Sequence, residues 1–192
     1  QQQLQQMPTL QNSIQYAEDS CSSLLYLALE CVDVRDDAAD EVASQIGIGW
    51  GLTIAIRGFT QRALWNSEWS IPADLISQHA IPLDYIIARQ HNTEFQPDPK
   101  KEQLLQEAVH YMAHVASQHL QTASGLLADN NNNISSKART ALLAAVPAKH
   151  YLIKLKEANY DLFHPKLQPQ AEQQSRLVLL AMLARGWWTG KF

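Results

Sequence analysis

The chain has 192 residues, of which 46% are hydrophobic and 18% charged, and its formal net charge is −4. This length is enough for one domain with a sizeable core, and the acidic balance argues against a nucleic-acid-binding protein, which usually presents a basic face. No segment approaches about 18 apolar residues without a charge, so the sequence predicts no membrane-spanning helix. Cys21 and Cys31 are too few for a disulfide framework or a zinc site of thiolates, and we expect buried free thiols.

The N-terminal third predicts a leader and two core helices. Residues 1–8 are rich in glutamine, and we interpret them as a flexible leader that suggests a processed end, a fragment or the tail of a longer precursor. Residues 9–192 then form one helical domain, which begins with a core helix over Thr9 to Cys31. The proline-free segment from Ala38 to about Arg62 predicts a central helix. Small residues follow one of its faces at four-residue spacing, which allows another helix to approach closely: Ala43, Gly47, Gly51 and Ala55.

An acidic run precedes this central helix and admits two interpretations. Asp36, Asp37 and Asp40 form an Asp-Asp-x-x-Asp string of the kind that binds magnesium diphosphate in terpene-forming enzymes. Acids also gather at helix N-termini, where they cap the first turn and complement the helix dipole. We favour capping and keep the magnesium site as the alternative.

The remainder of the chain predicts further helices. Their expected ranges are 71–76 with proline in its first turn, 82–89, 100–123, 136–146 closed by Pro147, 148–158 and about 172–188. Residues 125–133 are expected to form a solvated loop. In the last helix we expect Leu177, Leu180, Ala181 and Ala184 to be buried. Its basic, tryptophan-rich end either packs on the domain, which we favour, or touches a membrane surface.

Three histidines in the helix predicted over 100–123 invite a metal interpretation. His110 and His114 are four residues apart, and His119 follows one turn later. However, the zincin pattern His-Glu-x-x-His is absent, and no acid or thiol completes a site. We therefore interpret these residues as ordinary histidines of the polar face and core edge.

The central helix resembles the second aspartate-rich segment of squalene and phytoene synthases. The similarity extends from Ile46 to Leu75, with Leu52, Thr53, Arg57 and Pro72 in register. At the positions where those enzymes carry Gln, Asn and the acids of their Asp-x-x-Glu-Asp motif, this chain has Gly51, Ile54, Gly58, Gln61 and Arg62. Glycine, isoleucine and arginine cannot hold magnesium. Arg57 and Arg62 remain candidates for binding an anion or a lipid headgroup without turnover.

Other segments resemble one branch of this family, the mitochondrial complex I assembly factors. They include Ser22-Ser-Leu-Leu-Tyr-Leu, Ser44-Gln-Ile-Gly, Ile71-Pro-Ala-Asp and Tyr160-Asp-Leu-Phe-His-Pro-Lys-Leu-Gln. The resemblance implies an all-α, isoprenoid-synthase-like helical bundle, of which this chain is the C-terminal part. It also implies a pseudoenzyme without a cofactor, on the matrix side of the mitochondrial inner membrane.

The implied role is assembly or stability of respiratory complex I through protein binding. The expected partners are respiratory-complex subunits or other assembly factors, and a separate chain that supplies the N-terminal half is kept as an alternative. Two alternatives stay open. One is a permanent accessory subunit of a large inner-membrane complex, and the other is an active prenyl transferase that uses magnesium at Asp36, Asp37 and Asp40.

Overall fold

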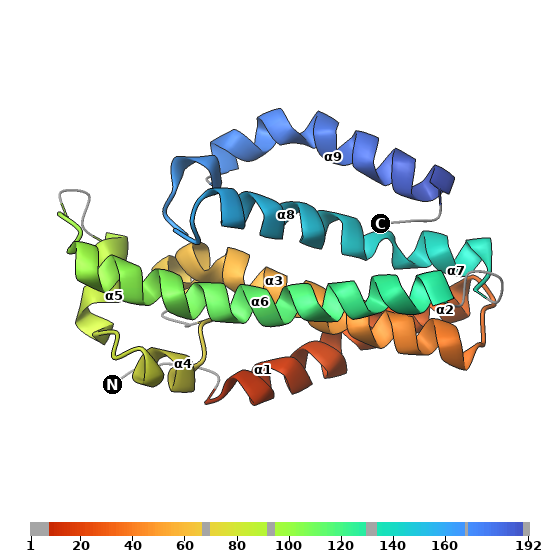
Figure 1. The fold of residues 1–192 in the computed structure, drawn as a ribbon, viewed down its shortest axis with the longest axis horizontal. Coiled ribbons are helices and arrows are strands. Elements are labelled where there is room, and N and C mark those ends of the chain that lie inside the picture. Colours follow the sequence, from red (N-terminus) through yellow and green to blue (C-terminus); the bar gives the residue numbers. More distant parts are fainter. Residues whose placement is uncertain (1–7, 67–69, 92–94, 130–133, 168, 190–192) are drawn as a thin grey trace.

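Two long antiparallel helices, α3 and α6, form the spine of the structure, a computed structural model (Figure 1). The structure describes residues 8–66, 70–91, 95–129, 134–167 and 169–189, without the side chains of 60–66, 83, 87, 90–91, 169–177 and 189. The helices are α1 (Leu10–Ala17), the π-helical turn η1 (Glu18–Ser22), α2 (Ser23–Cys31), α3 (Asp37–Asn66), α4 (Ala73–Gln78), α5 (Leu83–His91), α6 (Pro99–Asp129), α7 (Ser136–Ala141), the 3₁₀ turn η2 (Leu142–Ala144), α8 (Ala145–Glu157), the 3₁₀ turn η3 (Pro165–Leu167) and α9 (Pro169–Thr189).

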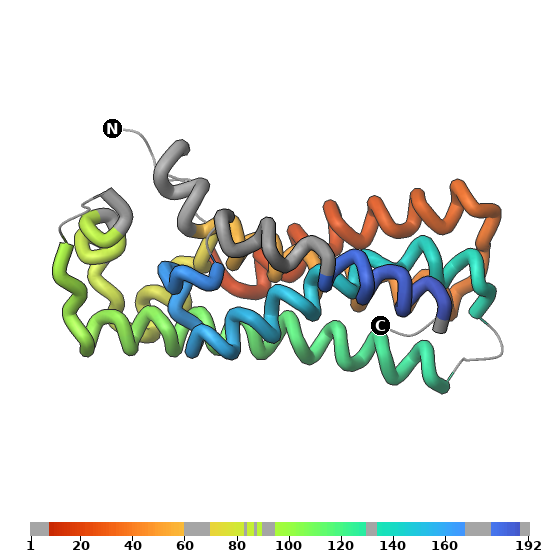
Figure 2. The backbone as a smooth tube through the Cα atoms, turned by 90° about the horizontal axis from the view of Figure 1, so that it is seen from above, coloured from red at the N-terminus to blue at the C-terminus, as the bar shows by residue number. Residues whose placement is uncertain are grey.

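The described residues contain no strand, which confirms the all-α architecture expected from the sequence. The helices α1, η1 and α2 pack along one side of α3, and α6 and α8 contact its other sides. The last helix, α9, lies over α8 (Figure 2). Within the described chain, no helix has both the length and the apolar character needed to cross a membrane.

The predicted central helix is confirmed in α3. Its side chains Ile46, Leu52, Ile56 and Phe59 are each at most 1% exposed. A helix that is apolar around most of its circumference is expected in the middle of a bundle. It extends beyond the predicted end at Arg62, as far as Asn66.

The stripe of small residues on α3 is a site of close helix contact, as predicted. A Cβ atom added at Gly47 would lie 2.5 Å from the backbone nitrogen of Ser22 and would overlap its Cα and Oγ atoms. At Gly51 an added Cβ would lie 2.5 Å from the Cβ of Ala17. The two glycines therefore set how closely α1 and η1 approach α3.

The N-terminal helical segment differs from the prediction in one respect. Residues 10–31 are helical throughout, but Glu18–Ser22 form a π-helical turn between α1 and α2. The hydroxyl of Ser20 donates to the carbonyl of Tyr16 at 2.5 Å inside this segment. Single π turns inside α-helices recur at functional sites and change the direction of the side chains that follow. Among those side chains, Ser22 is fully buried and Ser23 is exposed.

Two helix boundaries in the second half were predicted wrongly. The helix α6 continues through Gly125 to Asp129, because one glycine inside a long packed helix lowers its stability by only about 1 kcal/mol. Pro147 does not close a helix but lies in the first turn of α8, after Ala145 and Val146. Proline is tolerated there because the N–H groups of a first turn have no helical acceptor.

The expected buried face of α9 was also wrong. Leu180 is 61% exposed and Ala181 and Ala184 are exposed, whereas the side chain of Leu177 lies outside the described residues. Because the segment around residues 177–188 is apolar on all sides, its periodicity could not indicate which face contacts α8. The favoured packing of the tryptophans on the domain is corrected too, since Trp187 is 63% and Trp188 84% exposed.

The remaining expectations concern single residues. Cys31 is exposed and Cys21 is half-buried, so the two free thiols are not the buried pair expected. Residues 1–7 of the expected leader lie outside the described residues.

Gly47→Ala should destabilise the fold by about 1–3 kcal/mol, because the methyl group would push η1 away from α3. The matched control is Gly125→Ala in α6, where an added Cβ meets nothing within 4 Å. This control should stabilise the protein by about 0.5–1 kcal/mol through helix propensity. Chemical denaturation of both variants tests the pair, and equal effects of the two substitutions would contradict the close contact.

Candidate functional site

The positions at which the sequence resemblance places metal ligands of the synthases lie on one face of α3. Gly51, Ile54 and Gly58 are three and four residues apart, and all three are half-buried. Gly51 packs against Ala17 and Cys21 of the neighbouring helical segment. These three residues supply no side-chain oxygen. Arg57 is exposed, whereas the side chains of Gln61 and Arg62 lie outside the described residues, so an anion site at the two arginines stays a prediction.

The acidic run caps the N-terminus of α3. The Oδ1 atom of Asp36 accepts a hydrogen bond from the backbone N–H of Ala38 at 3.2 Å, and the Asp36 carbonyl accepts from Asp40 N–H at 3.0 Å. Partial burial, followed by the charges of Asp37, Glu30 and Asp36, raises the pKa of Asp40. The capping interpretation of Asp36 is therefore confirmed. Among the described residues, no group of three or more His, Cys, Asp or Glu side chains is placed to hold a metal ion.

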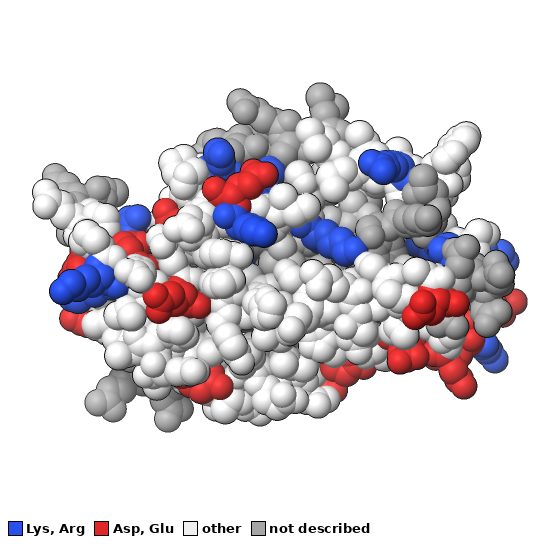
Figure 3. All heavy atoms as spheres, in the orientation of Figure 1, with Lys and Arg blue, Asp and Glu red and all other residues white. Residues whose placement is uncertain are grey.

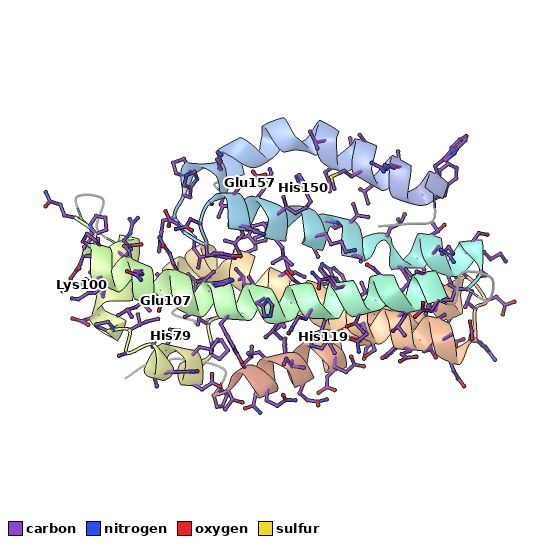
Figure 4. All side chains as sticks on the ribbon, viewed as in Figure 1. His79, Lys100, Glu107, His119, His150 and Glu157 are labelled. Carbon is purple, nitrogen blue, oxygen red and sulfur yellow. The ribbon has the colours of Figure 1, made fainter. Side chains whose placement is uncertain are left out.

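The three histidines of α6 do not converge on one point. His119 faces α3, where its Nδ1 atom lies 2.7 Å from the Oε1 atom of Gln45 (Figure 4). His110 and His114 instead line a groove between α6 and α8, with their ring centroids 6.5 Å apart. The sequence could not separate the two groups because their difference depends on where α3 and α8 pack.

A cluster of polar groups centred on Glu18 joins the π turn to α3. Oε2 of Glu18 accepts hydrogen bonds from the hydroxyls of Ser22 at 2.7 Å and Ser44 at 2.9 Å. Its Oε1 atom accepts from the Tyr26 hydroxyl at 2.6 Å. The three donors come from η1, α2 and α3, so one carboxylate ties together three elements that pack at the glycine stripe.

Burial and hydrogen bonding act in opposite directions on the ionisation of this cluster. Burial alone would raise the pKa of Glu18, but the hydrogen bonds from Tyr26, Ser22 and Ser44 and the field of His119 hold this pKa below its ordinary value of 4.5. Burial and the bond to Glu18 raise the pKa of Tyr26 to about 12. Burial lowers the pKa of His119 despite the nearby carboxylate. Near neutral pH the cluster therefore contains an ionised Glu18 and a protonated Tyr26.

The sequence pattern does not indicate this cluster. Glu18 precedes Asp19 in a polar stretch and has the pattern of a surface residue. Its inward position depends on the π turn, which periodicity does not predict. The sequence feature that could have indicated the cluster is the pair of serines, Ser22 and Ser44, close to the residues predicted to pack tightly.

Glu18→Gln should lower the free energy of unfolding at neutral pH by about 1–2 kcal/mol, because the amide group places donors against two hydroxyl donors. The folded-state pKa of Glu18 is depressed, so its stabilisation is present above the unfolded-state pKa and is lost as pH falls through the folded-state pKa. The stability difference between wild type and variant should therefore shrink below about pH 4.5.

The control for this prediction is Asp19→Asn, the adjacent exposed carboxylate that accepts a surface hydrogen bond from Gln15. It should change stability by less than about 0.5 kcal/mol. Urea denaturation at several pH values measures both variants, and a Glu18→Gln difference that stays constant with pH would exclude the ionised form as the stabilising one.

Comparison with known proteins identifies the family to which the chain belongs. The family model for squalene/phytoene synthase matches residues 1–178. The protein named NADH dehydrogenase (ubiquinone) complex I, assembly factor 6, is 28% identical in Rattus norvegicus and 27% in Homo sapiens. Each of these alignments covers 90% of this chain and 46% of the relative. A homologue of that name in Drosophila melanogaster is 27% identical over 78% of this chain and 41% of its own length.

The chain thus spans somewhat less than half the length of these curated relatives. No solved structure matches it significantly. The match to the family model extends from the first residue into the first half of α9 and includes all of α3. The chain belongs to the squalene/phytoene synthase family.

Proposed function

We propose that this chain acts without catalysis, by binding proteins, in the assembly or stability of mitochondrial respiratory complex I. The observation that carries the proposal is the similarity to relatives named complex I assembly factor 6 over 90% of the chain. The identity is low but extends over nearly all of the described helices, so it is not confined to one motif.

The chemistry of α3 supports a role without catalysis. Ionisation of a prenyl diphosphate needs magnesium ions held by clustered carboxylates. On the corresponding face this chain has Gly51, Ile54 and Gly58, and Ala17 packs against Gly51 in the space where a longer side chain would extend. A ligand-bearing side chain at position 51 would require α1 to move.

Exposed apolar side chains support protein binding. Tyr16, Leu24 and Leu27, on α1 and α2, are between 57% and 62% exposed. Large exposed side chains of this kind, close together on a surface, are typical of interaction sites. We infer that the partners are respiratory-complex subunits or assembly factors, or a chain that supplies the other half of the fold.

We infer a location at the matrix side of the inner membrane from the names of the relatives, and the end of α9 supports contact with a membrane surface. Trp187 and Trp188 are exposed next to Arg185, and tryptophans beside basic residues are enriched where proteins meet the membrane surface. We propose peripheral contact through this end of α9, with the assembly partners bound elsewhere on the molecule.

Affinity purification of the tagged, full-length protein from its own mitochondria, with separation of the complexes by native mass, tests the role. Co-migration with subcomplexes that contain complex I subunits, and absence from the mature complex, is the expected result. Fixed stoichiometry with the mature complex would instead establish a permanent accessory subunit. Magnesium-dependent turnover of farnesyl diphosphate by the purified protein would overturn the non-catalytic role.

The double variant Trp187→Ser/Trp188→Ser should keep the stability of the wild type within about 0.5 kcal/mol, because both side chains are largely exposed. Its binding to anionic phospholipid vesicles should fall by at least about tenfold, since two large aromatic groups no longer leave water. Tyr111→Ser on α6, which removes a side chain that is 50% exposed, is the control and should bind as wild type does. Vesicle sedimentation measures all three proteins, and unchanged binding of the double variant would rule out contact through α9.

A further inference from the structure

A basic groove lies between α6 and α8. It has a volume of about 570 Å³ and is lined from α6 by His110, His114 and Gln121, and from α8 by Lys149 and Lys156. Tyr160 lines it as well. Figure 3 shows lysine or arginine side chains along the boundary between these two helices. None of the described lining residues comes from α3, so Gly51, Ile54 and Gly58 do not line the groove.

The charged side chains that line the groove in the described part of the chain are basic. Lys149 and Lys156 are seven residues apart and therefore lie on the same side of α8. Among the lining residues that the structure describes there is no Asp or Glu side chain. Glu157, the next acid along α8, lies with His150 toward α9 rather than toward the groove (Figure 4). A protein of net charge −4 thus has a local concentration of cationic groups here.

Lys149 is held in a fixed position inside the groove. Its Nζ atom donates a hydrogen bond to the hydroxyl of Ser124 at 2.6 Å, and that hydroxyl donates to the carbonyl of Leu120 at 2.9 Å. The ammonium group is about half-buried, and burial lowers the pKa of Lys149. A preorganised cation that is partly removed from water interacts with an anion more strongly than a mobile surface lysine does.

Tyr160 marks the end of the groove near the C-terminus of α8 and belongs to a strained turn. Asn159 has φ 52° and Tyr160 has φ 60°, in the left-handed region that asparagine adopts readily at helix C-termini but a bulky tyrosine adopts rarely. The backbone N–H of Tyr160 donates to the carbonyl of Leu155 at 2.9 Å. This turn places the Tyr160 ring 4.3 Å from the ring of His110, between centroids. Strained residues held by their surroundings are frequent at binding sites.

We propose that this groove binds a phosphate group, carried either by a soluble phosphorylated molecule or by a phospholipid headgroup. Lysine ammonium groups, imidazoles and a phenol supply the donors that phosphate oxygens require. Leu120, Leu152 and Ile153 form an apolar wall for the organic part of the ligand. The volume lies within the range of small-molecule sites. This inference stands independently of a role in complex I assembly.

Isothermal titration of the full chain with inorganic pyrophosphate tests the shared chemistry. Saturable binding is expected, and Lys149→Gln should weaken it by at least about tenfold, because one charge-assisted hydrogen bond is lost. Lys156→Gln should also weaken pyrophosphate binding. Because Lys156 is exposed, this variant should fold, and it therefore tests the groove even if Lys149→Gln does not fold. The control is Lys100→Gln, which makes the same change in net charge at the N-terminal end of α6 (Figure 4). This variant should bind pyrophosphate as wild type does.

A second arm identifies the source of the phosphate. Vesicles of phosphatidylcholine with and without phosphatidic acid are compared by sedimentation, using wild type, Lys149→Gln and Lys100→Gln. Binding that requires phosphatidic acid and Lys149 supports a lipid headgroup, whereas binding of pyrophosphate alone supports a soluble ligand. Absence of saturable binding in both arms would overturn the proposal, as would an equal loss in Lys100→Gln.

Discussion

The close contact between η1 and α3 is the constraint on which the rest of the structure depends. Without a side chain at Gly47, the backbone of Ser22 can lie against α3, and the same approach brings Glu18 within hydrogen-bond distance of Ser44. The π turn supplies the change in direction that both contacts need. The glycine contact and the partly buried Glu18 cluster therefore depend on each other, because neither forms if η1 and α3 lie further apart.

This arrangement also determines what the face of α3 can do chemically. A side chain longer than hydrogen at position 51 would collide with Ala17, so α1 fills the volume that a ligand-bearing residue would need. The polar groups that the close contact buries are the Glu18 carboxylate and the hydroxyls that donate to it. They satisfy one another and tie three elements together. At Gly47 and Gly51 the central helix therefore contributes close packing and no ligand group.

The sequence predicted those features that are determined by local spacing, and it missed those that depend on which elements become neighbours. The four-residue recurrence of glycine and alanine was sufficient to predict close packing on α3, and the acids before it were sufficient to predict the cap at Asp36. In contrast, Leu180 has apolar neighbours on all sides in the sequence, so no pattern could show that it would be exposed. Glu18 and His110 gained their roles only when α3 and α8 were placed beside them.

Lys149 shows why the outer groove has the properties of a site and not only of a gap between helices. Half-burying an ammonium group carries a desolvation penalty, which partners such as the Ser124 hydroxyl have to offset. An apolar side chain at the same position would pack against Leu120 and Leu152 without that penalty. The strained backbone at Tyr160 adds a second local cost at the same groove. The half-buried Lys149 and the backbone at Tyr160 are two unfavourable contributions around one cavity, and the surrounding fold compensates for both. This is typical of a preorganised binding site, because folding has already supplied the free energy that would otherwise be needed to order the site on binding.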